Sequence, residues 1–180
     1  MSCELLFSLS TATLHLKCFP LLWQDIIRTG RITISLSQMN NSKQQPRGIR
    51  NNNPLNIRKG NTWIGERYPQ VDRSFEEFET MEYGLRAAFK LMRNYITGFG
   101  GKGVKYNTIR LLIRRWAPPS ENATQNYIDF VCSQVGKDQR EIIWFSDRKL
   151  MVSICRAMAF VECGQWIDKE KFESAYDMLL

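Results

Sequence analysis

Two glutamates that stand close to tryptophans are the residues best suited to catalysis in this sequence. Glu66 follows Trp63 by three residues, and Glu121 follows Trp116 by five. Sugar rings stack on aromatic faces, and cleavage of a glycosidic bond needs a carboxylic acid near the scissile oxygen. An apolar wall next to such a carboxyl raises its pKa by desolvation, as a proton donor at neutral pH requires. The pairing is a weak signal by itself, because most tryptophans of a small domain belong to its core.

The histidine content excludes several other kinds of hydrolytic site. The sole histidine, His15, lies near the N-terminus. A Ser-His-Asp triad, a Cys-His pair and a His-rich zinc site are therefore excluded from the remainder of the chain. We expect no cofactor and no metal site. For a hydrolase, a mechanism based on glutamate alone is what remains.

The turn between Trp116 and Glu121 admits two interpretations. Its two prolines fix a rigid turn, and we expect Glu121 and Asn122 in the first turn of the following helix. The helix dipole favours a carboxylate there, so Glu121 could serve only to stabilise the helix end. Alternatively, Arg115, Glu121 and Asn122 point into a groove and bind substrate. The sequence leaves both interpretations open.

Basic residues are segregated in one part of the chain. Between Tyr83 and Ser120 there are eight basic residues and no acidic one. Arg86, Lys90 and Arg93 fall on one helix face, opposite the apolar one, and form what we call the basic stripe. Arg110 and Arg114 repeat its spacing. Such a surface binds phosphates of nucleic acid, or it is a solvated face neutralised by the acidic segment just before it. That segment contains Glu66, Asp72, Glu76, Glu77, Glu79 and Glu82.

Composition divides the 180-residue chain near residue 45. The first 45 residues hold six charged groups and the remaining 135 hold 37, within a total net charge of +7. We expect residues 1–45 to be a leader that is disordered, or an artefact of an upstream start site with the true start at Met39. It makes a poor signal peptide, because Glu4 occupies the region before its apolar stretch. Residues 46–180 are expected to form one domain, with motifs in 46–136 and helices in 137–180. No apolar run is long enough to span a membrane.

Turn chemistry and helical periodicity predict a mainly helical α+β domain. Asn51–Pro54 form a turn cluster, and a short hairpin is expected around Lys59–Asn61, between "LNIR" and "TWIG". The segment "SFEEFE" supplies a third short strand. Apolar residues at helical spacing predict five helices. They cover 81–97 with Thr80 as cap, "TIRLLIRRW" capped by Asn107, "ENATQNYIDFVCSQV" capped by Ser120 and closed by Gly136, a helix from Ser146 to Gly164, and 168–179.

Four segments of the chain resemble a known group of proteins. "RGIRNNNPLNIR", "WIG", "FEEFETMEYGLRAAFKLMRNYI" and "NTIRLLIRRWAPPSENATQNYI", in this order, look like phage and prophage proteins usually labelled structural or virion proteins. The resemblance covers about 46–136. More loosely, the first part is similar to flagellar-type glucosaminidases of the lysozyme superfamily. That similarity implies a lysozyme-like fold and a peptidoglycan groove that includes Asn52, Asn53, Asn56 and Trp63.

One departure from the glucosaminidases bears on catalysis. Their catalytic glutamate precedes the Asn-rich turn, whereas here no glutamate lies between Asp25 and Asn51. Either the acid comes from Glu66, Glu82 or Glu121, or the domain binds glycan without cutting it.

The sequence therefore predicts a virion-associated protein with a lysozyme-like domain directed at peptidoglycan. It would reside in the virion, or in the bacterial cytoplasm before assembly. Glu121 or Glu66 would be the acid, Trp63 and Trp116 would hold sugars, and Arg115, Asn122 and the Asn cluster would position substituents. The alternative is a non-catalytic virion component that binds nucleic acid, or an acidic virion partner, through its basic residues (Arg86, Lys90, Arg93, Arg110 and Arg114).

Overall fold

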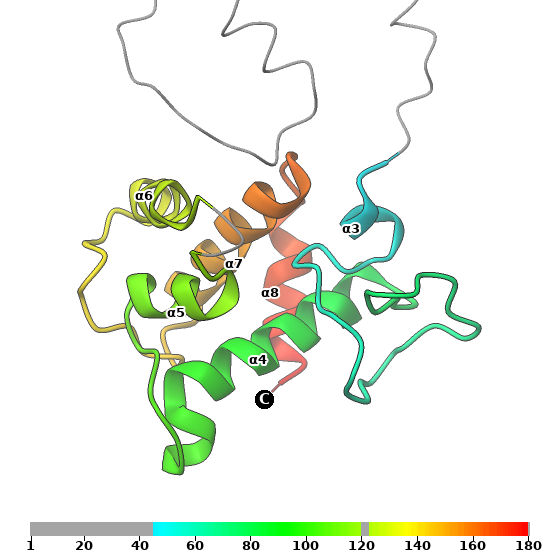
Figure 1. Ribbon diagram of the computed structural model, residues 1–180, viewed down its shortest axis with the longest axis horizontal. Helices are drawn as coiled ribbons and strands as arrows, with labels where there is room; N and C mark the ends of the chain where they lie inside the picture. The colour runs from blue at the N-terminus through cyan, green and yellow to red at the C-terminus, as the bar shows by residue number, and fades with distance from the viewer. Residues whose placement is uncertain (1–44, 120–122, 180) are drawn as a thin grey trace, which may run out of the picture.

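The computed structural model describes residues 45–119 and 123–179, and in this part of the chain the regular structure is helical (Figure 1). The helices described are α3 (Arg47–Arg50), α4 (Met81–Gly101), α5 (Ile109–Trp116), α6 (Thr124–Val135), α7 (Arg148–Cys163) and α8 (Lys169–Asp177). Apart from residue 45, the predicted leader lies outside the described residues.

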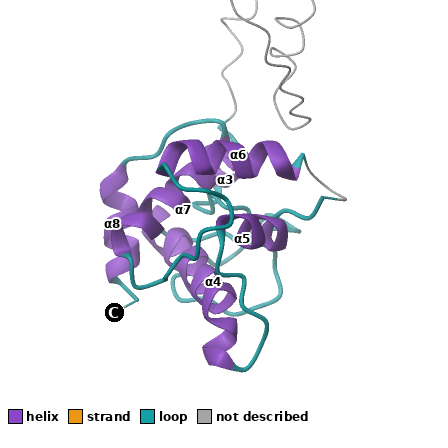
Figure 2. Ribbon diagram, turned by 90° about the vertical axis from the view of Figure 1, so that its left-hand side faces the viewer, coloured by secondary structure: helices purple, strands orange, loops and turns teal. Residues whose placement is uncertain are grey.

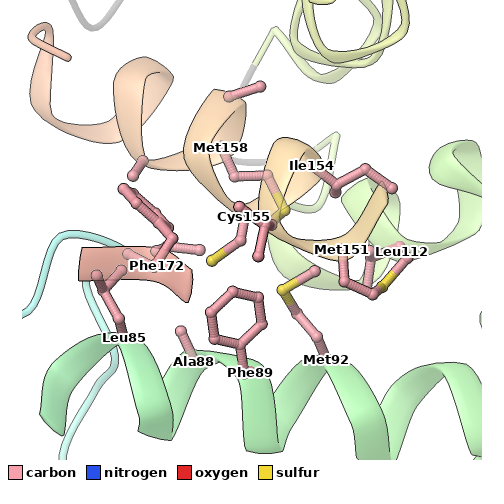
Figure 3. Packing of buried hydrophobic residues seen from close by; sticks show 14 of the residues in the cluster. Leu85, Ala88, Phe89, Met92, Leu112, Met151, Ile154, Cys155, Met158 and Phe172 are labelled. Atoms are coloured by element: carbon pink, nitrogen blue, oxygen red, sulfur yellow. The ribbon is translucent and has the colours of Figure 1, made fainter. Parts of the chain in front are cut away.

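The core lies where α4, α7 and α8 meet (Figure 3). Leu85, Phe89 and Met92 repeat at helical spacing on α4 and are completely buried. They face Cys155 of α7 and Phe172 of α8, and both of these side chains are also fully buried. Full burial of a large apolar side chain contributes about 1.5–3 kcal/mol. This cluster therefore fixes how the helices pack, as the apolar periodicity predicts.

Capping residues define most of the helix ends. Thr80 Oγ1 accepts a hydrogen bond from Tyr83 N, which confirms the predicted start of α4. The regular part of α4 ends at Gly98, which has φ +66°. Left-handed Gly136 and Gly164 close α6 and α7, as predicted.

Two of the predicted N-terminal caps need correction, and a third lies outside the described residues. The cap of α5 is Thr108 and not Asn107, because the Thr108 hydroxyl accepts from Leu111 N at 3.2 Å. Asp147 replaces Ser146 as the cap of α7 and accepts from Leu150 N at 3.0 Å. Helix α6 begins at Thr124, three residues later than expected, and the predicted cap Ser120 lies outside the described residues.

The segment before α4 is irregular, and its chain pairing differs from the predicted hairpin. Isolated antiparallel bridges join Arg58 to Phe75 and Glu66 to Phe78. The "LNIR" and "TWIG" regions therefore each pair with the "SFEEFE" segment, which lies between them. Backbone hydrogen bonds from Glu76 N to Ile57 O and from Arg67 N to Glu77 O reinforce the two bridges. The structure does not confirm a hairpin about Lys59–Asn61, and Figure 2 shows helices and loops without a named strand in the described residues.

Two glycines let the irregular segment lie directly against the start of α4 (Figure 1). A Cβ on Gly84 would stand 1.8 Å from the carbonyl oxygen of Asn52. Gly65, with φ +78°, lies against the Tyr83 ring, and a Cβ there would be 2.1 Å from its Cγ. Neither distance is compatible with a side chain. Backbone contact with α4 thus fixes the position of the Asn-rich turn.

Candidate functional site

An open hollow in the irregular segment brings two carboxylates together. We call it the acidic hollow. Its volume is about 520 Å³, within the range of roughly 300–1,000 Å³ typical of ligand pockets. Glu66 and Glu76 reach it from two extended stretches that run side by side, joined by the Glu66–Phe78 bridge. The hollow is lined by Lys59, Gly60, Asn61, Thr62, Glu66, Tyr68, Gln70 and Glu76.

Local hydrogen bonds hold the Glu66 carboxylate in place. One of its oxygens accepts from the backbone N–H of Trp63, and the other accepts from the Tyr68 hydroxyl at 2.5 Å. The hydrogen bond to Glu66 is the largest cause of a raised pKa of Tyr68, so this hydroxyl keeps its proton. Glu66, one of the acids predicted from the sequence, therefore lies beside an open cavity with both of its carboxyl oxygens hydrogen-bonded.

Glu76 is the second carboxylate of the acidic hollow, and sequence analysis did not select it. Only 3% of the residue is exposed. Burial raises its pKa, and the negative charge of Glu66 adds to this, while a hydrogen bond from Gln70 Nε2 at 3.2 Å opposes it. Burial therefore favours the protonated form of Glu76, which is the form that a proton donor requires.

The asparagines of the predicted groove are used mainly to hold the backbone. Asn53 Nδ2 donates to Ile57 O and Glu76 O, both at 2.9 Å, and its Oδ1 accepts from Ile57 N. Asn52 Nδ2 donates to the carbonyl oxygens of Phe78 and Glu79. These bonds engage both amide nitrogens within the fold, and the substrate contacts expected of Asn52 and Asn53 stay predictions.

Asn56 instead meets a carboxylate from the far end of the chain. Its Nδ2 donates to Glu162 at 3.0 Å, and the hydroxyl of Tyr127 donates to the other oxygen of Glu162 at 3.3 Å. Burial raises the pKa of Glu162. Nothing in the spacing of α7 distinguishes this glutamate, because its partners are more than 30 residues away along the chain.

The two predicted sugar-stacking tryptophans contact different parts of α4. The Lys90 ammonium lies 5.9 Å from the centre of the Trp63 ring, whereas Trp116 packs edge-on against Tyr95. Five residues of an α-helix correspond to about 140° of rotation about its axis, so the two contacts are on different faces of α4. The Arg115 guanidinium lies over the Tyr95 ring at 5.0 Å. The structure therefore groups Trp116 with Arg115, and it groups Trp63 with the irregular segment.

The other carboxylates considered for catalysis have different environments. Glu121 and Asn122 lie outside the described residues, so their predicted roles stay predictions. Glu82 accepts from Lys171 Nζ at 2.8 Å, and this contact is the largest cause of its lowered pKa. A carboxyl held in its charged form in this way is a poor proton donor at neutral pH.

The basic stripe forms no ion pair with the acidic segment in the part of the chain that is described. Arg86 Nε donates to the carbonyl oxygen of Met178, and Lys90 faces Trp63. The acidic residues before α4 are used elsewhere: Asp72 lies by Arg47, Glu77 by Arg67 and Glu82 by Lys171. These three acids thus pair with cations outside the basic stripe, and both interpretations of the stripe stay predictions. On α5, Arg114 is exposed and Arg110 half-buried.

Residues 45–119 and 123–179 hold no group of three or more His, Cys, Asp or Glu side chains arranged to bind a metal ion. They also contain no helix with the length and apolar character needed to cross a bilayer.

Comparison with known proteins relates the chain to a phage protein. Over 94 residues it is 44% identical to Protein P5 of Pseudoalteromonas phage PM2. The match covers 50% of this chain and 56% of that protein, so the chain spans about half the length of the curated relative it matches. No family model matches the chain. Identity at this level over 94 residues indicates common ancestry, and this chain is a homologue of a phage protein.

Proposed function

We propose that this protein is a virion-associated phage component whose folded part binds and cleaves the glycan strands of bacterial peptidoglycan. The phage origin follows from similarity to a phage protein. The observation that carries the enzymatic part is the acidic hollow, where Glu76 and Glu66 line one open cavity in different hydrogen-bonding environments. Detection of the protein in purified particles by mass spectrometry tests the virion association.

Glycosidic cleavage requires the two carboxyl groups to differ in protonation. Glu76, whose pKa is raised by burial, donates its proton to the glycosidic oxygen, and the bond from that oxygen to the anomeric carbon breaks. Glu66 faces the positive charge that develops on the sugar ring, because the Trp63 amide and the Tyr68 hydroxyl keep its carboxylate oriented. The oxygen of a water molecule, or of a hydroxyl of the sugar itself, then bonds to the anomeric carbon and gives its proton to the Glu76 carboxylate, which restores the acid.

The exposed Tyr68 ring supplies an aromatic surface at the edge of the hollow. Its exposed fraction is 75%, and its hydroxyl is fixed by Glu66. A fixed aromatic face at the rim suits stacking against a sugar ring, in the role that the sequence prediction gave to tryptophan. Asn61 and Thr62 line the same hollow and offer polar groups to the sugar hydroxyls.

A cell-wall zymogram with the full-length chain tests this proposal. We expect the parent protein to clear peptidoglycan, and Glu76→Gln and Glu66→Gln each to lower the rate by about 10²–10⁴-fold, as loss of an acid or base does. Glu79→Gln is the matched control, since Glu79 is exposed and does not line the hollow. Glu121→Gln distinguishes the acid predicted from the sequence.

The outcomes separate the candidate acids. No clearing by the parent protein removes the enzymatic proposal. Full clearing by both Glu66→Gln and Glu76→Gln, with loss only in Glu121→Gln, removes the acidic hollow as the catalytic site and assigns the acid to Glu121. Melting curves of each variant show whether a loss of activity reflects loss of the fold. Because Glu76 must be protonated to act, activity falls as the pH rises through its raised pKa.

A second candidate function rests on the basic stripe. Within the described residues Arg86, Lys90 and Arg93 form no ion pair with a carboxylate, so they stay available to an anionic polymer such as nucleic acid. A gel shift at increasing salt, with the three residues changed to Glu, tests this function. Abolished binding in that variant favours it, whereas unchanged binding excludes the stripe as the site.

A further inference from the structure

A second hollow, of about 550 Å³, lies on the irregular segment and is lined by arginines. We call it the arginine hollow. Arg67 and Glu77, which line it, directly follow Glu66 and Glu76 of the acidic hollow in the sequence. Consecutive side chains of an extended chain point to opposite faces. The two extended stretches around Glu66 and Glu76 therefore contribute side chains to both hollows. Its lining comprises Arg47, Arg50, Asn51, Arg67, Val71, Asp72, Arg73, Ser74 and Glu77.

The two carboxylates of the arginine hollow are occupied by the loop that carries them. Asp72 accepts from Ser74 N at 2.9 Å, from Phe75 N at 3.1 Å and from Asn51 Nδ2 at 2.9 Å. These bonds, with the Ser74 amide first, lower the pKa of Asp72 to about 2. One oxygen of Glu77 accepts from Val71 N at 3.0 Å and from Asp72 N at 2.5 Å. Both charges therefore serve mainly to hold the backbone between residues 71 and 75.

The guanidinium groups, by contrast, retain most of their hydrogen-bonding capacity. Arg47 Nε lies 3.5 Å from Asp72, and Arg67 Nη1 lies 3.7 Å from Glu77. Both distances exceed the roughly 2.7–2.9 Å of a charge-assisted hydrogen bond. Elsewhere in the molecule, Arg148 binds Asp177 with two bonds of 2.7 Å. The arginine hollow thus lacks the close pairing that this chain forms when an arginine serves only the fold.

The remaining two arginines have no carboxylate partner among the described residues. Arg50 and Arg73 are exposed, and no hydrogen bond or ion pair of their side chains is present within residues 45–119 and 123–179. Four guanidinium groups therefore share the hollow with two carboxylates that are already engaged. The Arg47 guanidinium also stacks on the Phe75 ring at 5.1 Å, which restricts its motion before any ligand arrives.

We infer that the arginine hollow binds a phosphate group carrying two negative charges, on a ligand larger than a lone ion. The planar fork of a guanidinium matches two phosphate oxygens, and several forks around one concavity match a dianion better than a singly charged carboxylate. The volume leaves room for the part of the ligand beyond its phosphate. This inference is independent of glycan cleavage, since it concerns the opposite face of the two extended stretches.

Isothermal titration of the full-length chain tests the site. Pyrophosphate represents a free inorganic phosphate compound, and glycerol 3-phosphate represents a dianionic phosphate monoester of an organic molecule. We expect saturable binding of at least one of them and at least tenfold weaker binding by the double variant Arg50→Gln/Arg73→Gln. These two side chains form no contact that the fold needs within the described residues, so the variant should keep the parent melting temperature.

The control variant removes two positive charges from a part of the surface outside both hollows. Arg140 and Lys149 are exposed and line neither hollow, so Arg140→Gln/Lys149→Gln should change the affinity less than twofold. A loss confined to the first double variant supports the site, and the ligand that binds identifies the source of the phosphate. Equal losses in both double variants, or no saturable binding of either ligand by the parent, overturn the inference.

Discussion

Residues 46–80 and the helices after them bury their side chains in different ways. In the helices, buried positions are apolar and recur at helical spacing, as in Leu85, Phe89 and Met92 of α4. In residues 46–80, buried positions include amides and carboxylates that bond to nearby backbone. Five of the six buried polar or charged residues in the described chain belong to this stretch: Asn51, Asn53, Glu66, Glu76 and Glu77.

The difference indicates separate roles for the helices and for residues 46–80. Apolar burial is non-directional and tolerates the approximate spacing of a helix. Hydrogen bonds from buried amides and carboxylates fix individual backbone groups, and they leave charged side chains along the surface of the same stretch. Both hollows lie there, so the helices act as a support on which a polar surface is held.

The largest expected effect concerns the helical core. Phe89→Ala removes a fully buried ring that packs edge-on against Tyr176 at 5.4 Å, so we expect the free energy of unfolding to fall by about 4 kcal/mol. Phe99→Ala, at a position where 52% of the residue is exposed, should change it by less than about 0.5 kcal/mol. Urea unfolding measures both. Equal effects would contradict the assignment of stability to the core.

The contact between the two regions should be nearly as sensitive. In Gly84→Ala the new methyl group would meet the Asn52 carbonyl oxygen, which belongs to the backbone and cannot rotate away. We expect a loss of about 3 kcal/mol, the upper end for overpacking. As a matched change, Gly103→Ala places its Cβ 3.5 Å from the nearest side chain, at ordinary contact distance. If both substitutions are tolerated alike, the irregular segment does not depend on close approach to α4.

Asn53→Ala tests the hydrogen bonds from buried amides that hold the backbone of residues 46–80. This change leaves Ile57 N, Ile57 O and Glu76 O without the side-chain partner they share. We expect a loss of about 2 kcal/mol, because buried backbone groups would lose their bonds. Asn61→Ala, at an exposed position, is the control for stability alone, because Asn61 lines the acidic hollow. The Asn53 variant should also lose any activity of the acidic hollow in proportion, because Glu76 is held by the same bonds.

The smallest effect is a change in how stability depends on pH. Burial raises the pKa of Glu162 above its ordinary value of 4.5, so the native state binds this proton more tightly than the unfolded chain does. Its contribution is complete below pH 4.5 and is lost as the pH rises through the raised native pKa. Glu162→Gln cannot ionise and should flatten this decline in urea titrations carried out from pH 4.5 upwards, whereas exposed Glu170→Gln should leave it unchanged. An unchanged slope would show that Glu162 is charged in the native protein.

The helices could be predicted from the sequence because their signals are local. Apolar residues at helical spacing, with Thr80 before and Gly98 after, mark α4 without knowledge of any other part of the chain. The errors at Asn107 and Ser146 amount to one residue each, since neighbouring Thr108 and Asp147 are equally good caps.

The irregular segment could not be predicted in the same way. Its pairing depends on hydrogen bonds between residues about 10 to 25 positions apart, such as Asn53 with Glu76, and no periodicity records them. Glu76 was missed for a related reason. Glu76 and Glu77 are both buried, and each lines a different hollow, so the alternation of polar and apolar residues does not show which of the two faces solvent. Glu66 was selected through its neighbour Trp63, but its contact is with that residue's backbone.

The back-to-back arrangement of the two hollows restricts how this stretch of chain can evolve. Side chains alternate between faces, so a one-residue deletion that shifts the pairing of residues 65–67 with residues 77–79 would turn Glu66 towards the arginines and Arg67 towards Glu76. Point substitutions alter one hollow at a time, whereas a change in length exchanges their linings. Homologues that keep both chemistries should therefore preserve the number of residues here more strictly than their identities.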